Sequence, residues 1–600
     1  MGISKKWGLV AAVSAGVGLM AGTAAELLLP APAAVAQAAE PTTAKLADVC
    51  TTEVVQAVAA TLPTGVTVQP VKNGPFGSAT HFVPASGSRP AYCQVTGSFV
   101  TNPATGKTAN FLATFPEAWN GKYLQLGCSG HCGQFYVSNP ATPSIVVTAQ
   151  GHPGQLIEKG YATFATDEGH VGMDGASWAV KPDGKVDQDY VDDFLYRADK
   201  VLAHMGKSFT TAFYSRLSGV TQTISHSYFN GCSGGGRDAM VVASYFPEEF
   251  DGIIAGSPYN PLGMSLQASA TALAAQRAPD ARLTPALLAL MAKVVTKECD
   301  GLDGVQDGLI QNPAACNFRP ERDLPLCAPG TSSKECFTKH QMETVSTIIH
   351  AITDENGRVL QAGYSPSELG ALGGDLNMLS DPMLKIMVHL NDPNYAIAPS
   401  FSFRYGGPGP VSGFHIVASS AEAAAVRDAL GAGAGHIQDN TGRLMASPTK
   451  LMIWHNFSDE KLTPFNSTNW YKQLARDHGG YASVQNKVRL FMLPGTAHCS
   501  ITGIAPNSFD AMSAMENWVE KGQAPEALQA SVADHQFTPG APKAPALLTP
   551  NYTMPLCKFP EMARYSGHGD THDGANWSCK ANDTRLLQVG ASGREAGVLN

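Results

Sequence analysis

The segment from Asn230 to Ala239 reads NGCSGGGRDA and contains the pattern G-x-S-x-G, with Ser233 at its centre. This pattern is typical of a nucleophile elbow, a sharp turn from a strand into a helix in which glycines leave the serine hydroxyl exposed. The flanks agree, because Thr223–Phe229 is rich in β-forming residues and Arg237–Phe246 carries apolar residues at helical spacing. A glycine-rich turn without chemistry is the alternative for the pattern alone, but the flanks favour a reactive serine in an α/β protein.

A reactive serine needs a base and a carboxylate, and in chains with this elbow the acid comes before the histidine. We predict buried strands over Lys450–Trp454 and Val488–Leu493, with Asp459 on the loop after the first and His498 on the loop after the second. Loops beyond the carboxyl ends of strands are where α/β sheets hold catalytic groups. The predicted triad is therefore Ser233, Asp459 and His498. The alternatives are a capping aspartate and a surface-loop histidine.

Two cysteines adjoin the predicted triad. Cys232 precedes Ser233, and Cys499 follows His498. A disulfide between these cysteines would hold the hydroxyl beside the imidazole through a covalent bond. The alternatives are that Cys232 is merely small and buried, or that it is itself the nucleophile, which the glycine spacing around Ser233 argues against.

The residues Cys232-Ser233, Asp459 and His498-Cys499 resemble the pattern of the tannase and feruloyl esterase family of α/β-hydrolases. The resemblance covers nearly all of the chain after residue 45 and weakens between about 360 and 445. It extends to the segments 115–122 (FPEAWNGK), 164–170 (FATDEGH), 250–258 (FDGIIAGSP) and 555–565. It implies an α/β-hydrolase fold with a large inserted lid domain and a secreted serine esterase that cleaves a small aromatic ester, feruloyl, galloyl or related.

Ester hydrolysis also needs donors for the negative oxygen of the tetrahedral intermediate. The N–H of Gly234, directly after the nucleophile, is the first candidate, and the resemblance assigns the second to Gly127, in the glycine-rich loop after a predicted strand over Tyr123–Leu126. The alternative for Gly127 is an ordinary turn. Relatives in the family often carry Thr or Glu at the position of Gly234.

Twelve cysteines, together with the export signal described below, imply an oxidising compartment and a disulfide framework. The chain departs from most relatives by adding two cysteines, which we predict to bridge within the loop 127–133. The pairs that the resemblance implies, followed by this added pair, are Cys50–Cys93, Cys232–Cys499, Cys299–Cys316, Cys327–Cys336, Cys557–Cys579 and Cys128–Cys132.

The segment 300–309, DGLDGVQDGL, alternates carboxylates with glycines. Such an oxygen-rich turning loop suits a hard cation such as calcium, although the spacing is not that of an EF-hand. The resemblance implies a structural calcium site with side-chain oxygens from Asp300, Asp303 and Asp307 and carbonyl oxygens from Val305 and Leu309. The alternative is an Asp/Gly-rich turn without a metal.

Six hundred residues exceed what one hydrophobic core usually serves. We expect a signal peptide over residues 1–38, a first part of the catalytic domain over 45–258, a lid domain with the calcium loop over 259–447, and a second catalytic part over 448–600. The lid would bury the substrate and determine specificity. Its helical segments are expected at Ala268–Arg277 and Pro285–Lys297.

An arginine in the lid grips the free carboxylate in the terephthalate monoester hydrolases of this family. Arg404, beside Phe401, Phe403 and Tyr405, is the candidate here, and the alternative is a surface arginine that packs on aromatic rings. We therefore favour feruloyl or galloyl esters and keep an activity like that of mono(2-hydroxyethyl) terephthalate hydrolase as the alternative. A secreted serine peptidase and a non-catalytic binding module are further alternatives.

The amino terminus has the features of an export signal. Lys5 and Lys6 precede an apolar run from Trp7 to about Ala25, and alanines at 34, 36 and 38 offer cleavage sites. We expect a secreted or periplasmic protein, with a retained membrane anchor as the alternative. The net charge of -9, without a basic stripe, argues against nucleic acid or an anionic membrane as partner of the mature form. The sequence does not specify an oligomeric state.

Overall fold

A computed structural model of the chain describes residues 44–135, 153–173, 175–370, 372, 383–407, 413–429, 441–501, 503–532 and 551–580. The expected signal peptide lies outside these residues. Among the helices within them, none is both long and apolar enough to cross a bilayer.

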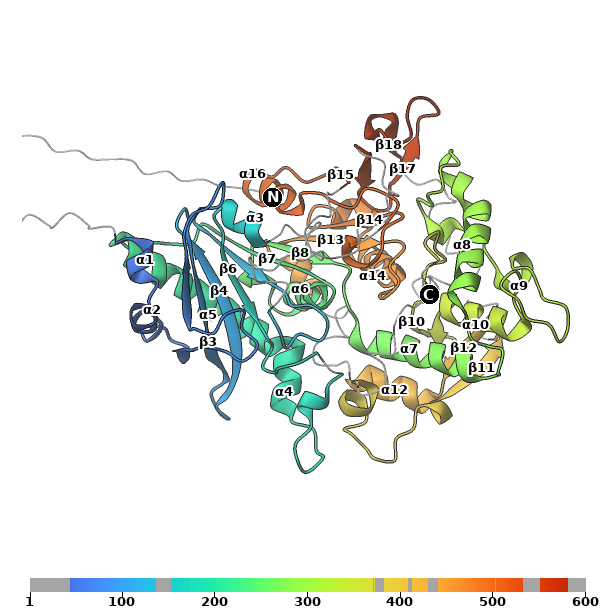
Figure 1. The fold of residues 1–600 in the computed structure, drawn as a ribbon, viewed down its shortest axis with the longest axis horizontal. Coiled ribbons are helices and arrows are strands. Elements are labelled where there is room, and N and C mark those ends of the chain that lie inside the picture. The colour runs from blue at the N-terminus through green and yellow to red at the C-terminus, as the bar shows by residue number, and fades with distance from the viewer. Residues whose placement is uncertain are drawn as a thin grey trace, which may run out of the picture. The chain divides into compact units, whose positions relative to one another are not determined.

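A mixed sheet forms the centre of the described chain (Figure 1). Its order is β1-β3-β4-β6-β5-β7-β8-β13-β14, with β2 paired to β3. The pairs from β6 through β14 are parallel, and those among β1 to β4, together with β4 and β6, are antiparallel. The strands are β1 (Val66–Val68), β2 (Thr80–Val83), β3 (Tyr92–Asn102), β4 (Lys107–Pro116), β5 (Lys122–Leu126), β6 (Ala162–Thr166), β7 (His226–Cys232), β8 (Gly252–Gly256), β13 (Lys450–Asn456) and β14 (Val488–Leu493).

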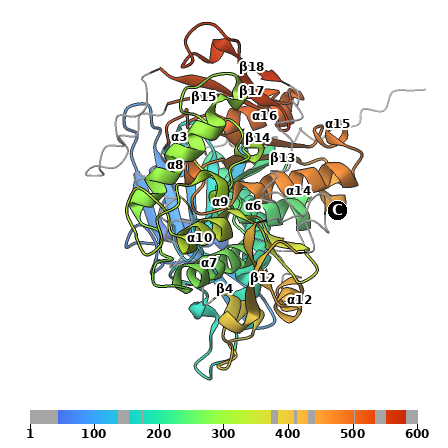
Figure 2. The same ribbon diagram turned by 90° about the vertical axis from the view of Figure 1, so that its right-hand side faces the viewer.

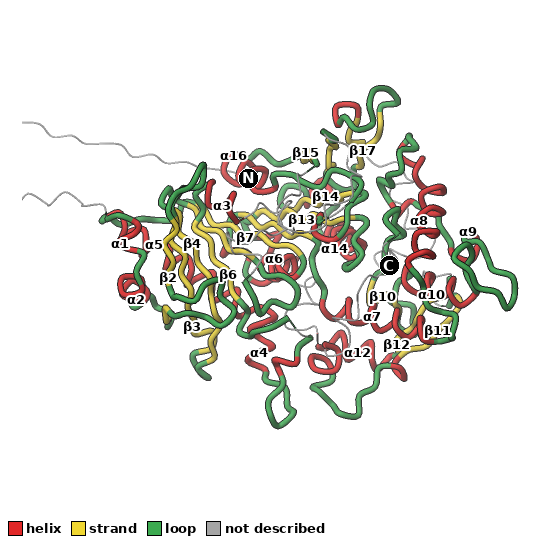
Figure 3. Tube along the Cα trace, in the orientation of Figure 1, coloured by secondary structure: helices red, strands yellow, loops and turns green. Residues whose placement is uncertain are grey.

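The parallel strands are buried along almost their whole length, because helices cover both faces of the sheet (Figure 3). One apolar core joins the sheet to α5, α6 and α14, and a second joins the opposite face to α3 and α16. The α/β class is thus confirmed. The helices that precede, connect or follow these strands are α1 (Leu46–Val49), α2 (Thr52–Ala59), α3 (Pro153–Glu158), α4 (Gln188–Asp192), α5 (Ala198–Ser218), α6 (Gly234–Tyr245), α13 (Thr441–Ala446), α14 (Pro464–Asp477), α15 (Tyr481–Val484) and α16 (Ala511–Lys521).

A long segment interrupts the sheet between β8 and β13. It contains a small sheet of order β10-β9-β12-β11 and helices that pack around an apolar core of their own. Figure 1 shows α7, α8 and α10 together, apart from the central strands, and in Figure 2 the same helices face the viewer. Its elements are α7 (Pro261–Gln276), α8 (Pro285–Cys299), α9 (Pro320–Asp323), α10 (Lys339–Ile349), β9 (Ile352–Thr353), β10 (Val359–Gln361), β11 (Phe401–Tyr405), β12 (Phe414–Ala418) and α12 (Ser420–Ala429).

Two short antiparallel pairs follow α16. They join β15 (Ala527–Ser531) to β16 (Thr553–Cys557) and β17 (Met562–Tyr565) to β18 (Trp577–Lys580). The twelve cysteines form six disulfides, in the pairs named above: Cys50–Cys93, Cys128–Cys132, Cys232–Cys499, Cys299–Cys316, Cys327–Cys336 and Cys557–Cys579.

Candidate active site

Ser233 lies at the turn between β7 and α6, with φ 64° and ψ -118°. A positive φ is strained for a residue with a side chain, and such strain persists where the surroundings impose it. The turn is crowded, since a Cβ on Gly231 would lie 2.5 Å from the carbonyl oxygen of Gly235 and a Cβ on Gly235 would lie 2.8 Å from that of Cys128. Glycines at both positions therefore allow the chain to reverse with the serine side chain at the apex.

The structure brings the three predicted triad residues together. Nε2 of His498 lies 2.9 Å from Oγ of Ser233, and Nδ1 of His498 lies 2.8 Å from Oδ2 of Asp459. With its proton on Nδ1, the imidazole donates to the carboxylate and accepts from the serine hydroxyl. The carboxylate and the imidazole are buried, whereas Ser233 is partly exposed. A chain of hydrogen bonds in this order can activate a serine nucleophile.

The disulfide between Cys232 and Cys499 lies next to this chain of hydrogen bonds, with Sγ of Cys499 3.6 Å from Nε2 of His498. It joins the last residue of β7 to the residue after His498, across 267 positions of sequence. Cys499 has a φ of 51°, so the loop after β14 also turns sharply here. The bridge fixes the backbones that carry the hydroxyl and the imidazole to each other.

The Asp459 carboxylate has more partners than His498 alone. Its Oδ1 accepts the N–H groups of Lys461 and Leu462 at 2.9 and 2.8 Å, and Nε2 of His455 lies 3.3 Å from its Oδ2. Burial raises the pKa of Asp459, but His498 and His455 outweigh that effect and hold the pKa well below its ordinary value. The carboxylate is therefore ionised over the whole working pH range of a histidine base.

The sequence interpretation missed two neighbours of the predicted triad. His455 is fully buried and also bonds through Nδ1 to Oγ of Ser467 at 2.7 Å. Glu460 accepts the backbone N–H of His498 at 3.1 Å. Both side chains stand in the segment 455–460, HNFSDE, next to Asp459, so their proximity in sequence was the available signal.

The backbone N–H groups of the two predicted oxyanion donors, Gly234 and Gly127, differ in their surroundings. Gly234 is the first residue of α6, so its N–H has no carbonyl partner within the helix. The N–H of Gly127 already donates to the carbonyl of Asn230 at 3.0 Å, as part of the pairing between β5 and β7. Gly127 has another reason to be glycine, because a Cβ there would lie 2.4 Å from Cα of Gly235.

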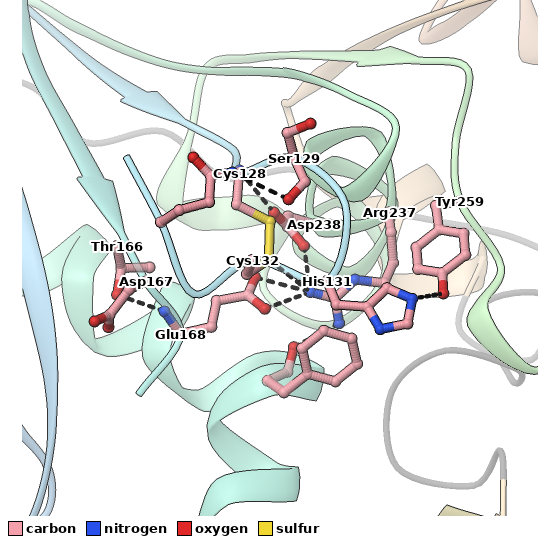
Figure 4. Close-up of a disulfide and its surroundings, with 12 residues drawn as sticks. Cys128, Ser129, His131, Cys132, Thr166, Asp167, Glu168, Arg237, Asp238 and Tyr259 are labelled. Atoms are coloured by element: carbon pink, nitrogen blue, oxygen red, sulfur yellow. Dashed lines mark hydrogen bonds and ion pairs between the residues drawn. A yellow bond between two sulfur atoms is a disulfide. The ribbon is translucent and has the colours of Figure 1, made fainter. Parts of the chain in front are cut away.

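A buried cluster of charges lies beneath the loop after β5 (Figure 4). Arg237 on α6 donates to Glu168 at 2.7 Å and to Asp238 at 2.6 Å, and all three side chains are about 1% exposed. Burial raises the pKa of Glu168 well above its ordinary value, with Arg237 acting in the opposite direction. Asp238 in turn accepts the backbone N–H of Cys128 at 3.2 Å. The cluster therefore connects the elbow helix to the loop.

The acidic segment 300–309 folds as a tight turn after α8. Oδ1 of Asp300 accepts the backbone N–H groups of Asp307 and Gly308 at 3.1 Å, and Oδ1 of Asp303 accepts that of Val305. The other carboxylate oxygen of Asp303 is buried and has no hydrogen-bond partner. Burial, together with the charges of Asp307 and Asp300, raises the pKa of Asp303 to about 7.

Arg404 lies in β11, paired with His415 of β12. Its side chain is 39% exposed, and one guanidinium nitrogen is 3.9 Å from Oε1 of Glu355. The cation that contacts aromatic rings here is instead Arg277, whose guanidinium lies 4.9 Å from the ring centre of Phe414. The structure thus gives Arg404 an acidic neighbour.

Comparison with known proteins adds to this geometry. A family model described as tannase and feruloyl esterase matches residues 93–389 and 435–580. A probable feruloyl esterase of Arthroderma benhamiae is 27% identical over an alignment of 494 positions, which covers 77% of this chain and 81% of that protein. The mono(2-hydroxyethyl) terephthalate hydrolase of Piscinibacter sakaiensis is 25% identical over an alignment of 562 positions, which covers 82% of this chain and 85% of that protein.

The solved structures include one with the same fold. The crystal structure of feruloyl esterase B from Aspergillus oryzae matches with a TM-score of 0.67 and 23% identity. The match covers 88% of this chain and 100% of that one.

Proposed function

Because the chain belongs to the tannase and feruloyl esterase family of carboxylic ester hydrolases, we propose that it is a secreted serine esterase that cleaves aromatic acid esters of the feruloyl, galloyl or a related type. One observation carries the proposal: the continuous hydrogen bonding from Ser233 through His498 to Asp459, at 2.9 and 2.8 Å. The serine is at a strained elbow, and the acid is buried and ionised.

The mechanism follows from these contacts. Oγ of Ser233 attacks the ester carbonyl while Nε2 of His498 takes its proton, and the carbonyl oxygen becomes negative. The N–H of Gly234 donates to that oxygen. His498 then passes the proton to the leaving alcohol, and the acyl group remains on Ser233. Water, deprotonated by the same imidazole, releases the acid.

His498 acts as a base only in its neutral form, with the proton on Nδ1. His498 and His455 hold the pKa of Asp459 well below its ordinary value, so the carboxylate is ionised. Asp459 orients the ring and stabilises the imidazolium that forms during attack.

The arrangement of elements supports an α/β-hydrolase fold in which residues 259–447 form the lid. The predicted triad stands at the carboxyl ends of the parallel strands β7, β13 and β14, on loops. The inserted segment leaves this sheet after β8 and returns at β13. A lid in this position would cover the substrate and exclude water.

We propose that the segment 300–309 holds a structural Ca²⁺ ion. The cation prefers six to eight oxygen ligands, and this segment carries three aspartates. The buried oxygen of Asp303 that has no hydrogen-bond partner supports the proposal, because a cation would satisfy it. Asp300, Asp303, Asp307 and the carbonyls of Val305 and Leu309 would hold it. Its contribution would be to stability, with no step in catalysis.

Hydrolysis of a terephthalate monoester is the second candidate activity. It is favoured by the similarity over 82% of the chain to a mono(2-hydroxyethyl) terephthalate hydrolase. Arg404 is the proposed partner of the substrate carboxylate. Its guanidinium would then contact the substrate in place of Glu355. Replacement of Arg404 by Ala would then lower activity on the monoester and leave methyl ferulate hydrolysis unchanged.

The test of the proposed function is a substrate panel with two variants. Methyl ferulate, methyl gallate, chlorogenate and a terephthalate monoester are offered to the parent, to Ser233→Ala and to Ser208→Ala. Ser208 is a matched control, because its hydroxyl donates only to its own helix, at the carbonyl of His204. We expect at least one ester to be cleaved by the parent and by Ser208→Ala, and its turnover to fall by about 10⁴-fold or more in Ser233→Ala. A turnover in Ser233→Ala equal to that of the parent would reject the assignment of Ser233 as the nucleophile.

A further inference from the structure

The loop closed by the disulfide Cys128–Cys132, called the disulfide loop below, lies against the residue that follows the nucleophile. We propose that this loop is a rigid wall of the ester-binding site and determines which acyl groups the enzyme accepts. The inference rests on the proposed function and adds the part of the site that sets specificity. It concerns residues 128–132, none of which takes part in the proton transfers.

Contact with Gly234 places the disulfide loop beside the attacked carbonyl. A Cβ at position 234 would lie 2.5 Å from the carbonyl oxygen of Gly130 and 3.1 Å from Sγ of Cys128. The N–H of Gly235 also donates to the carbonyl of Cys128 at 3.0 Å. The loop therefore fills the space in which another protein would carry a side chain after its nucleophile, and it borders the oxyanion side of Ser233.

Contacts at His131 hold the disulfide loop in place. Its Nε2 lies 2.7 Å from the hydroxyl of Tyr259, and its carbonyl accepts from Nε2 of His170 at 2.7 Å (Figure 4 shows the first contact). Burial lowers the pKa of His170 to about 4, so His170 is a neutral donor at ordinary pH. The backbone N–H of Tyr259 donates to the carbonyl of Ser233 at 3.1 Å. Tyr259 thus links the loop directly to the nucleophile.

The base of the disulfide loop rests on the buried charge cluster. Asp238 accepts the N–H of Cys128, and Arg237 lies 3.9 Å from Sγ of Cys132 while it donates to Asp238 and Glu168 (Figure 4). Both cysteines are buried, with 4% and 0% exposure. The disulfide loop has five residues, is closed by a covalent bond and rests on charge-assisted hydrogen bonds. It therefore has little freedom to move when a substrate binds.

One edge of the disulfide loop borders an exposed apolar surface. Gly130 is partly exposed, and Sδ of Met173 is 3.3 Å from the position of a Cβ on Gly130. Met173 and Val171 are 38% and 44% exposed, which is unusual for large apolar side chains in the described residues. A thioether edge of this kind favours an aromatic ring.

These features favour flat acyl groups. A benzoyl, feruloyl or galloyl group is planar beside its carbonyl and would slide between the wall and the nucleophile, with its ring toward Met173. An acyl group that is branched at the α-carbon projects out of that plane and would meet the backbone of Gly130. The disulfide loop thus selects planar aromatic acids by steric exclusion of branched ones.

The experiment measures kcat/KM for 4-nitrophenyl benzoate and 4-nitrophenyl isobutyrate, which share a leaving group and differ in the acyl group. In Cys128→Ala/Cys132→Ala the loop is released and the sulfur beside Gly234 is removed, so the isobutyrate-to-benzoate ratio is expected to rise about tenfold or more. Tyr259→Phe loses only the hydroxyl that holds His131 and is expected to raise the same ratio by about threefold.

The matched control is Cys327→Ala/Cys336→Ala, which opens another short disulfide, of separation 9, in the inserted segment. Its isobutyrate-to-benzoate ratio of kcat/KM is expected to equal that of the parent. Circular dichroism and thermal melts identify any variant that does not fold, and Tyr259→Phe decides the question if the double cysteine variant is among them. A parent-like ratio in every folded variant of the loop would overturn the inference.

A second experiment measures whether the effect of Gly234→Ala on kcat/KM depends on the disulfide loop. Gly234→Ala adds the methyl group that would meet Gly130, and it is expected to lower kcat/KM by about 100-fold in the parent. In the Cys128→Ala/Cys132→Ala background the loop can retreat, so the same change is expected to cost about tenfold or less. Equal losses in both backgrounds would contradict a wall made by the loop. If the parent cleaves no ester at all, the proposed function is rejected. The failure of the proposed function can therefore be distinguished from the failure of the inference about the disulfide loop.

Discussion

His455 lies with its Nε2 atom 3.3 Å from Oδ2 of Asp459, the oxygen that also receives His498. The carboxylate therefore faces two imidazoles, of which only one reaches the serine. The second ring is fixed by Ser467 through Nδ1 and is fully buried, so it has no direct access to a substrate. We interpret His455 as a positioning residue for the acid.

Replacement of His455 by Phe removes one of the interactions that lower the pKa of Asp459. The carboxylate then orients His498 less well, and kcat is expected to fall about tenfold with KM nearly unchanged, since substrate contacts are intact. Steady-state kinetics across pH measure both parameters. Ser467→Ala is the control, because it keeps the second imidazole and is expected to have a smaller effect. A parent-like kcat and pH profile in His455→Phe would refute this role.

Removal of the Cys232–Cys499 bridge tests whether the covalent link between the segments that carry Ser233 and His498 supports activity. The bridge closes a span of 267 residues, for which the loop-closure model gives about 5.6 kcal/mol of stabilisation. In Cys232→Ala/Cys499→Ala we expect a lower melting temperature and a kcat about 100-fold lower per folded molecule, because Ser233 and His498 lose their fixed separation.

The control for the bridge is Cys50→Ala/Cys93→Ala, which opens a disulfide between the residue after α1 and β3. It is expected to lower the melting temperature while the folded fraction keeps its kcat. If the variant without the Cys232–Cys499 bridge turns over at the parent rate, the bridge serves stability alone.

Calcium removal is expected to destabilise the protein. Without the cation, Asp300, Asp303 and Asp307 repel one another, and an oxygen of Asp303 is left buried without a partner. Chelation should lower the melting temperature by several degrees, and added Ca²⁺ should restore it. Asp303→Asn should have a lower melting temperature than the parent, and neither chelation nor added Ca²⁺ should change it. An unchanged melt, with no calcium in the purified protein by elemental analysis, would reject the site.

The buried carboxyl of Asp199 predicts a loss of stability as the pH rises from the unfolded pKa to the folded pKa of this group. Burial raises its pKa to about 8, with Asp238 adding to the shift and Arg237 opposing it. The unfolded chain has a pKa of about 3.9 here, so the stabilisation is complete below that value and is lost as the pH rises through about 8. Asp199→Asn cannot ionise and still offers an oxygen to Gln125, which donates to Asp199 at 2.8 Å.

Melting temperatures at about pH 5, 7 and 9 test this prediction. The fall between pH 5 and 9 should be smaller in Asp199→Asn than in the parent by a few degrees. Asp183→Asn, at an exposed turn, serves as the control and should follow the parent. A parallel decline in all three proteins would show that Asp199 does not cause the loss of stability over this pH range.

Local sequence patterns were sufficient for the parts of the fold that have local causes. The strand expected over Val488–Leu493 has those bounds in the structure, because an apolar run between polar turns leaves few alternatives. The strand expected over Thr223–Phe229 lies instead at His226–Cys232. Its end is set by pairing with β8 up to Cys232, and a partner strand is not visible in a local window.

The remaining parts depend on contacts between distant residues. The small sheet of the inserted segment has strands of two to five residues, which are too short to give a period. Gly127 was expected to serve the substrate, yet its N–H is used by Asn230, about a hundred positions away. The Cys128–Cys132 bridge was predicted, but the charge cluster beneath it could not be foreseen, since Cys128 and Asp238 meet only in the folded chain.

Covalent labelling of the nucleophile tests the central claim most directly. The parent protein is treated with a serine-reactive aryl phosphonate, and the labelled peptides are mapped by mass spectrometry. We predict one adduct per chain, on Ser233, with loss of esterase activity in proportion to labelling and no adduct at this peptide in Ser233→Ala. Complete inactivation with the adduct on another residue, or full activity after stoichiometric labelling of Ser233, would contradict the account.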